Sequence, residues 1–378
     1  MKNILKRNRQ ELILLLIILA VGGIIGGINP VFFSTPNLLD ILSNMVIDGI
    51  FAFAVMLGII IGGIDVSFPA IAVSSMYITT RVAVGADYQG PLVLLFLMSV
   101  GIGLLLGLFN GLLITTFKLP AFIVTLGTSN LFYGLLISIA GGAQVNRLAT
   151  PMEAFSKLAL FKVSSESGTS AVPVILLFML LVMAITAFIL RRTMLGRMIY
   201  AIGGDRVSAE KVGFPVKKVT IFVYGYIGAA AGLAGLCHTI QVRACYPTDL
   251  MGGEMLIIAA VVLGGTTISG GRGTVFGTFL GLFLITMIKS SLILIGVPSV
   301  WQTFVVGMMI VIGTAGGCEG LHQPPRGRLQ MHGALEGLRR RGKGAFAVRK
   351  IQKMHGDLLR SLAKRLEARA ACRCSLII

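Results

Sequence analysis

Long apolar stretches recur along this chain, and they constrain its fold more than any other feature. Hydrophobic residues make up 55% of the sequence and charged residues 13%, whereas soluble proteins have roughly 45–50% and about 25%. A helix needs about 20 apolar residues to cross the hydrocarbon of a bilayer, and the stretches lack the alternation of a membrane β-barrel. The sequence therefore predicts an all-α polytopic membrane protein.

About ten transmembrane helices account for the apolar stretches. The predicted spans are residues 11–31, 43–62, 68–84, 91–117, 119–141, 172–190, 219–240, 253–266, 275–296 and 299–316. Residues 1–10 then form an N-terminal arm, residues 11–316 a transmembrane domain and residues 317–378 a basic tail. Residues 143–172 are the largest loop, too polar to span.

Glycine-rich breaks separate predicted spans at two places. The sequence GGIDVS at residues 62–67 and the sequence GGTTIS at residues 264–269 share the pattern GGxxxS. Glycine-interrupted segments in two halves of a membrane protein indicate a transporter with its pathway near the breaks, although chance similarity in a chain with 48 glycines is an open alternative. We expect short broken or re-entrant helices at both places.

Basic residues predict the orientation. Seven of them lie in residues 191–218, and four more lie in the N-terminal arm. Lysine and arginine are retained on the cytoplasmic side, so we expect the arm and residues 191–218 there. An even number of spans places the C-terminus in the cytoplasm as well.

Residues 191–218 also contain signals for a short helix. Asp205 is a favourable N-cap after Gly203 and Gly204, and Gly213 is typical of a helix end, so we expect a helix over residues 206–212. Pro215 prevents its continuation. Such a capped helix on the cytoplasmic face favours contact with a soluble partner over a merely solvated loop.

The sequence contains no convincing catalytic set. His238 is the only histidine before the tail, no cysteine spacing indicates a zinc site, and no GxxxxGK[ST] motif for ATP is present. We expect a protein that is not an enzyme and binds no metal or cofactor itself.

Several polar residues within the spans are candidate solute contacts. Asp65 lies at a helix break, where it faces a polar cavity, lies at the cytoplasmic interface or acts as a structural cap, and Glu254 is expected to cap a helix. The neutral candidates, with neighbouring aromatic residues, are Asn110, Thr125, Thr128, Ser129, Asn130, Gln302, Phe122, Tyr133 and Trp301. Neutral hydrogen-bonding groups suit a neutral, polyhydroxylated solute, although hydrogen bonding between helices is the alternative for each.

Glycines at four-residue spacing indicate close helix packing. The rows are Gly22/Gly26, Gly103/Gly107/Gly111, Gly228/Gly232 and Gly273/Gly277/Gly281. Each row places small residues on one helix face, where another backbone can approach.

The ordered motifs resemble those of sugar-type permeases of bacterial ATP-binding-cassette importers. They are GGIDVS at 62–67, NGLLITTFKLPAFIVTLGT at 110–128, GRMIYAIGGDRVSAEKVGFPVKKV at 196–219, AGLAG at 231–235 and IAAVVLGGTTISGGRGTVFGT at 258–278. The resemblance covers residues 12–315.

This resemblance implies a permease subunit for a simple sugar or related neutral solute in the bacterial cytoplasmic membrane. It implies three partners, namely a separate ATP-binding-cassette subunit that uses ATP, an extracytoplasmic solute-binding protein and a second permease copy, identical or related. The implied ATPase-coupling residues are Gly203, Asp205, Arg206, Ala209, Glu210 and Gly213. Asp65, Asn110, Phe122 and Gln302 are the candidate pathway residues.

Alternatives to a sugar permease are a branched-chain amino acid permease of the same superfamily and an ion-coupled secondary transporter. The tail departs from the family pattern, because residues 318–378 contain 14 Lys and Arg against 4 Asp and Glu. It is interpreted as a nonfunctional extension, for instance from a shifted reading frame, or as an appendage that binds anionic lipid or nucleic acid. No motif supports nucleic-acid binding.

Overall fold

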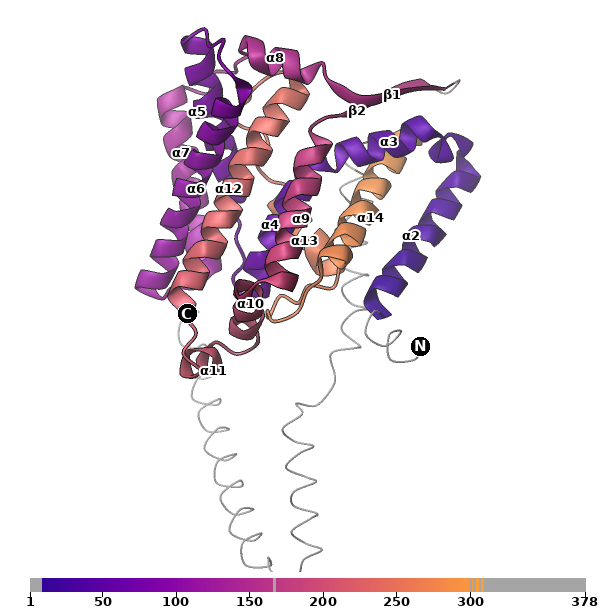
Figure 1. The fold of residues 1–378 in the computed structure, drawn as a ribbon. Helices are drawn as coiled ribbons and strands as arrows, with labels where there is room; N and C mark the ends of the chain where they lie inside the picture. The colour runs from indigo at the N-terminus through magenta and orange to yellow at the C-terminus, as the bar shows by residue number, and fades with distance from the viewer. Residues whose placement is uncertain (1–8, 166–167, 299–300, 302–303, 306, 309–378) are drawn as a thin grey trace, which may run out of the picture. The chain divides into compact units, whose positions relative to one another are not determined.

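The computed structural model describes residues 9–165, 168–298, 301, 304–305 and 307–308. Most of these residues are helical (Figure 1). The elements are α2 (Arg9–Ile28), η1 (Pro30–Phe33), α3 (Thr35–Asn44), α4 (Val46–Ile60), α5 (Phe68–Gly85), α6 (Leu92–Phe117), α7 (Ala121–Ala140), α8 (Thr150–Ser156), β1 (Ala159–Ser165), β2 (Gly168–Pro173), α9 (Leu176–Arg192), α10 (Met194–Gly204), α11 (Arg206–Lys211), α12 (Val216–Val242), α13 (Glu254–Leu263) and α14 (Val275–Leu294).

The helical, membrane-spanning character that the composition predicts is confirmed. Among the described residues, five helices are long and apolar enough to cross a bilayer, namely those within α2, α6, α7, α12 and α14. The bent pairs α3–α4 and α9–α10 raise this number to seven if each pair is one span. Every predicted span up to residue 296 contains a helix, but α4, α5, α9 and α13 do not reach that length and hydropathy on their own. The predicted span at 299–316 lies largely outside the described residues.

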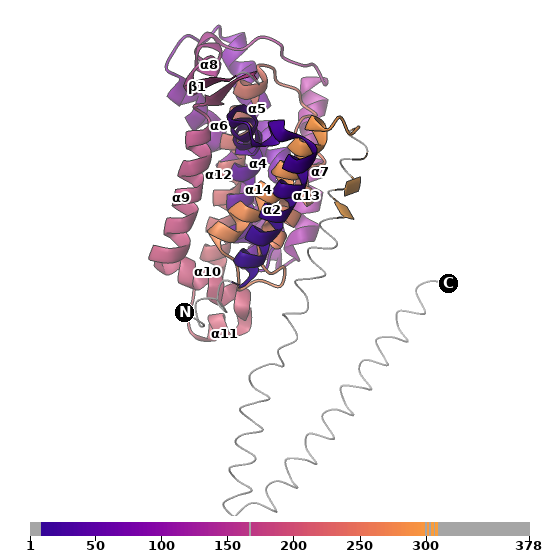
Figure 2. The ribbon, with the colours of Figure 1, turned by 90° about the vertical axis from the view of Figure 1, so that its right-hand side faces the viewer.

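Helix α4 forms the centre of the packing, with other helices on its sides in two perpendicular views (Figures 1 and 2). Of its 15 residues, 14 are buried, and Asp48 is the exception. Its sequence VIDGIFAFAVMLGII is apolar around the whole circumference, which is the composition of a helix enclosed by protein. Helices α12, α9, α13 and α14 contact it.

Helices α6 and α12 cross where two of the predicted glycine rows meet. A Cβ atom on Gly103 would lie 2.2 Å from the Gly228 carbonyl oxygen, and one on Gly107 would lie 2.3 Å from the Tyr224 carbonyl oxygen. The Ser99 hydroxyl donates a hydrogen bond across the crossing to the Gly232 carbonyl at 2.7 Å. The predicted packing role of these two rows is confirmed. The row Gly277/Gly281 similarly packs α14 against the end of α13.

The loop predicted at 143–172 contains regular structure that the sequence reading missed. It includes α8 and an antiparallel hairpin of β1 and β2, in which Lys162 pairs with Ala171. A two-stranded hairpin satisfies its backbone locally and needs no apolar span. Figure 1 shows α3, α8 and the hairpin at one end of the helices and α10 and α11 at the opposite end.

Candidate functional site

The segment that contains α10 and α11 has the predicted caps. The Asp205 carboxylate accepts hydrogen bonds from the backbone N–H groups of Val207 and Ser208, at 3.0 and 3.3 Å. The hydroxyl of Ser208 donates to the same side chain, and these hydrogen bonds hold the pKa of Asp205 below its ordinary value. Gly213, with φ of +91°, ends the helix, which at Arg206–Lys211 is one residue shorter than predicted.

Helix α11 presents apolar side chains at the end of the protein. Val207 and Val212 are 61% and 72% exposed, whereas Ala209 is buried against the rest of the chain. Arg206 and Glu210 form an exposed ion pair at 3.6 Å. Both valines lie on a turn whose first residues are capped by Asp205.

The break between α4 and α5 contains a buried polar cluster. The backbone N–H and hydroxyl of Ser67 donate to Asp65 Oδ1 at 2.7 and 2.6 Å. The Asn110 side-chain amide on α6 donates to the Ser67 hydroxyl at 2.7 Å, and the Val66 N–H donates to the Thr125 hydroxyl on α7 at 3.3 Å. The cluster therefore joins three transmembrane elements at the break.

Asp65 is buried inside the protein, with 1% of its surface exposed. Its Oδ2 atom has no hydrogen-bond partner among the described residues, and neither has Oδ1 of Asn110 or the hydroxyl of Tyr224. A buried polar atom without a partner costs about 1–3 kcal/mol. These three atoms leave the buried cluster with free hydrogen-bonding capacity.

A cavity of about 140 Å³ lies beside this break. Gly62, Gly63 and Tyr224 line it, and so does Arg206 from α11. The cavity therefore lies between the break and the exposed helix α11.

The structure brings some of the predicted pathway residues together and separates others. Asp65 and Asn110 meet through Ser67, and Thr125 joins them through the backbone. Phe122 makes no side-chain contribution to this network and is 40% exposed. Gln302 lies outside the described residues.

Other predicted residues have local roles. Thr128 is buried and bonds to the Thr125 carbonyl, while the side-chain amide of the exposed Asn130 bonds to the Leu126 carbonyl at 3.0 Å. Glu254 is the first residue of α13, so its charge lies at the helix N-terminus as predicted, but its carboxylate accepts from the Gly252 N–H before the helix, at 3.1 Å, and no side-chain bond caps the first turn. Ser67 and Tyr224 were missed, although Ser67 ends the GGIDVS motif.

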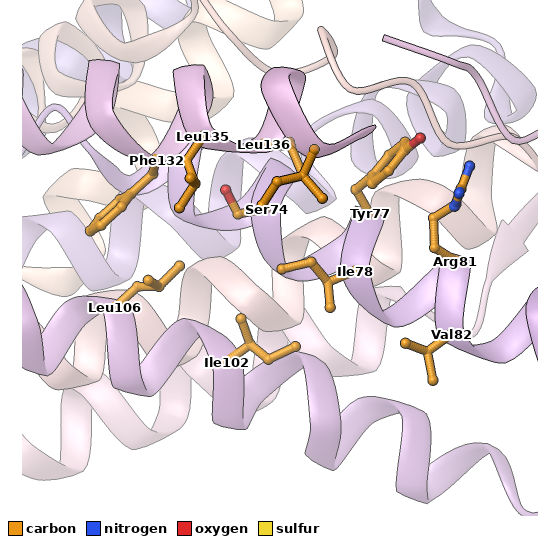
Figure 3. Close-up of a pocket in the computed structure, with 11 residues that line it drawn as sticks. Ser74, Tyr77, Ile78, Arg81, Val82, Ile102, Leu106, Phe132, Leu135 and Leu136 are labelled. Carbon is orange, nitrogen blue, oxygen red and sulfur yellow. The ribbon is translucent and has the colours of Figure 1, made fainter. Parts of the chain in front are cut away.

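A second cavity, of about 260 Å³, lies between α5, α6 and α7 (Figure 3). Its walls are mostly aliphatic, the hydroxyl of Ser74 within it has no partner among the described residues, and Arg81 at one end lies over the Tyr77 ring at 5.9 Å. None of the predicted site residues lines it. An apolar groove of this kind does not suit a polyhydroxylated solute.

Comparison with known proteins decides the family. Residues 37–313 match the model of a family described as "Branched-chain amino acid transport system / permease component". The chain belongs to this permease family. The resemblance noted from the motifs is confirmed, and the permease is a multi-pass membrane protein.

Two relatives illustrate the range of the family. The permease is 33% identical over 305 residues to the autoinducer 2 import system permease protein LsrC of Yersinia enterocolitica, which covers 81% of each chain. It is 35% identical over 290 residues to the ribose import permease protein RbsC of Bacillus subtilis, covering 76% of this chain and 87% of the relative. No solved structure matches.

Proposed function

We propose that this permease is the transmembrane subunit of an ATP-driven importer that admits a simple sugar or a related neutral solute. The observation that carries the proposal is the capped helix α11, which is exposed at one end of the protein and shares a cavity with the start of the helix break, since Arg206 and Gly62 both line it. The relatives named for ribose and autoinducer 2 import support the solute class.

The proposed importer needs other proteins. The chain has no P-loop sequence, so ATP binds to a separate cassette subunit that docks on α10 and α11, with Gly203, Asp205, Arg206, Ala209, Glu210 and Gly213 as the coupling residues. An extracytoplasmic solute-binding protein delivers the solute at the opposite end, where α8 and the hairpin lie. A second permease copy completes the path.

The chemistry of the broken helix favours a neutral solute. Asp65 is the one charged side chain in the buried cluster, and the other side chains in it are hydroxyl and amide groups from Ser67, Asn110 and Thr125. An amino acid carries both an ammonium and a carboxylate, which need complementary charges when they are desolvated. The family description nevertheless makes a branched-chain amino acid the second candidate.

Charge reversal at the cap tests the docking assignment. Asp205→Arg removes the acceptor for two N–H groups of α11, so we expect at least about tenfold less cassette subunit to co-purify with the permease. Glu153→Arg is the matched control, because Glu153 is an exposed acid in a local ion pair on α8, at the opposite end. Equal co-purification with the two variants would contradict the assignment.

The solute class is tested separately with the reconstituted complex. ATP hydrolysis by the complete importer, with its binding protein, is expected to rise on addition of a pentose sugar and not on addition of leucine. Stimulation by leucine alone would favour the amino acid permease.

A further inference from the structure

Three segments that are distant in the sequence meet at the end of α10 with no side chain between them. The last turn of α10 contains Gly203, and α4 ends at Ile60. A Cβ atom on Gly203 would lie 1.7 Å from the Ile60 carbonyl oxygen and 2.6 Å from the Gly271 nitrogen. The Gly271 N–H donates a hydrogen bond to the same Ile60 carbonyl at 2.8 Å.

The third segment is the loop between α13 and α14. Gly270 and Gly271 have φ of +86° and +76°, in the left-handed region that favours glycine. A Cβ atom on Gly270 would lie 2.7 Å from the Gly203 carbonyl oxygen. We name Gly203, Gly270 and Gly271, with the Ile60 carbonyl, the glycine junction.

A side-chain hydrogen bond fastens α10 to the same loop. The Tyr200 hydroxyl, one helical turn before Gly203, donates to the Gly273 carbonyl at 2.8 Å. Both helix breaks are therefore attached to α10, the first through Ile60 and the second through the loop 264–274.

We propose that the glycine junction transmits movement of α10 and α11 to both broken helices, with Gly203 and Tyr200 as positioning residues; this inference rests on the proposed docking of a cassette subunit. Because the backbones touch directly, no flexible side chain lies between them to absorb a displacement. Close-packed segments of this kind transmit strain. Packed elements of this kind move as rigid bodies in switching transitions.

The contacts continue from the junction to the buried polar cluster. Ile60 precedes the break at 61–67, where Ser67 bonds to Asn110 on α6 and Val66 bonds to Thr125 on α7. Displacement of the Ile60 carbonyl therefore changes the position of the groups that hold Asp65. The cavity wall, which includes Ile61, moves with them.

Two adjacent glycines provide a matched test. Gly203→Ala places a methyl group against the Ile60 carbonyl, whereas the Cβ of Gly204→Ala would have no atom within 4 Å. Each substitution is made in the full chain that carries Ile61→Cys as a reporter and serine in place of Cys318, Cys372 and Cys374, co-expressed with the cassette subunit. The rate at which a small maleimide modifies the introduced cysteine is measured with and without ATP and vanadate, so no solute is required.

We expect ATP and vanadate to change the modification rate at least about threefold in the reporter background and in Gly204→Ala. In Gly203→Ala we expect this change to be lost in whatever complex is recovered, and the amount of complex and its rate of ATP hydrolysis are measured in parallel. A merely structural defect would lower the yield of complex without removing the ATP dependence of the complex that remains. The same ATP dependence in Gly203→Ala as in Gly204→Ala would overturn the proposal.

If Gly203→Ala does not form a complex with the cassette subunit, Tyr200→Phe tests the proposal in its place. It removes one hydroxyl that bonds to the Gly273 carbonyl, and we expect the ATP-dependent change to fall about twofold or more. An undiminished change in this variant would then overturn the proposal. Failure of the reporter background to bind any cassette subunit is a different result, because it contradicts the proposed function itself.

Discussion

At the scale of single residues, two asparagines on neighbouring helices have opposite surroundings. Asn110 is completely buried and donates from its side chain to Ser67, which is 43 positions away. Asn130 is exposed and bonds only to the Leu126 carbonyl within its own helix. The Asn110 side chain connects two segments of the protein. The Asn130 side chain bonds to a carbonyl within its own helix and connects nothing.

We expect Asn110→Ala to destabilise the permease and Asn130→Ala to leave it nearly unchanged. Loss of the Asn110 amide removes a buried hydrogen bond and leaves the Ser67 hydroxyl with one bond fewer, at a cost of about 1–3 kcal/mol. The midpoint of thermal unfolding of the detergent-purified protein, followed by the size-exclusion profile after heating, measures the difference. Equal midpoints would show that the polar cluster contributes nothing to stability.

The difference between these residues also shows what the sequence could predict. The cap at Asp205 and the helix end at Gly213 depend on neighbours within the same turn, and local rules predicted both. The partnership of Ser67 with Asn110 depends on how α5 packs against α6, for which no local pattern exists. Tyr224 similarly reaches the break at Gly63 only through the packing of α12.

At the scale of elements, the crossing of α6 and α12 depends on glycines that point at the partner helix. Gly107 faces α12, since a Cβ atom on it would lie 2.3 Å from the Tyr224 carbonyl oxygen. Gly101 lies on the same helix, and a Cβ atom on it would have no atom within 4 Å. The four-residue spacing predicted a small face on α6, but not which helix would pack there.

We expect Gly107→Ala to separate the two helices and lower stability by about 1–3 kcal/mol, because the added methyl group overpacks a backbone contact. Gly101→Ala is the control, and we expect no loss there, since alanine is the better helix former by about 1 kcal/mol. Thermal unfolding of the two purified variants makes the comparison. A similar effect of the two substitutions would mean that α6 and α12 do not cross as closely as the structure shows.

At the scale of the whole molecule, hydropathy predicts the order of the helices along the chain. It does not predict which helices are long enough to cross a bilayer. Helix α4 is shorter than a bilayer crossing, yet its almost complete burial means that it faces protein and not lipid. Helix α13 is likewise a short apolar helix that the second break separates from α14. Hydropathy therefore predicts segments well where helices face lipid and less well where they are enclosed.

The orientation of the permease is tested at its two ends. Lys157, just after α8, and Lys211, in α11, are both exposed and lie at opposite ends of the helices. The positive-inside rule places Lys211 in the cytoplasm, since it belongs to the basic segment 191–218. Cys237 and Cys245 are buried, so a cysteine introduced at either lysine is distinguishable once Cys318, Cys372 and Cys374 are replaced by serine.

We expect a membrane-impermeant maleimide to label Lys157→Cys in intact spheroplasts and to label Lys211→Cys only after the membrane is permeabilised. The permease is expressed without its cassette subunit, so that docking does not protect α11. The reversed pattern would show that α11 is extracytoplasmic, where no ATPase could reach it, and the proposed coupling would be wrong. Labelling of both variants in intact spheroplasts would instead contradict the arrangement in which the hairpin and α11 lie on opposite sides of the membrane.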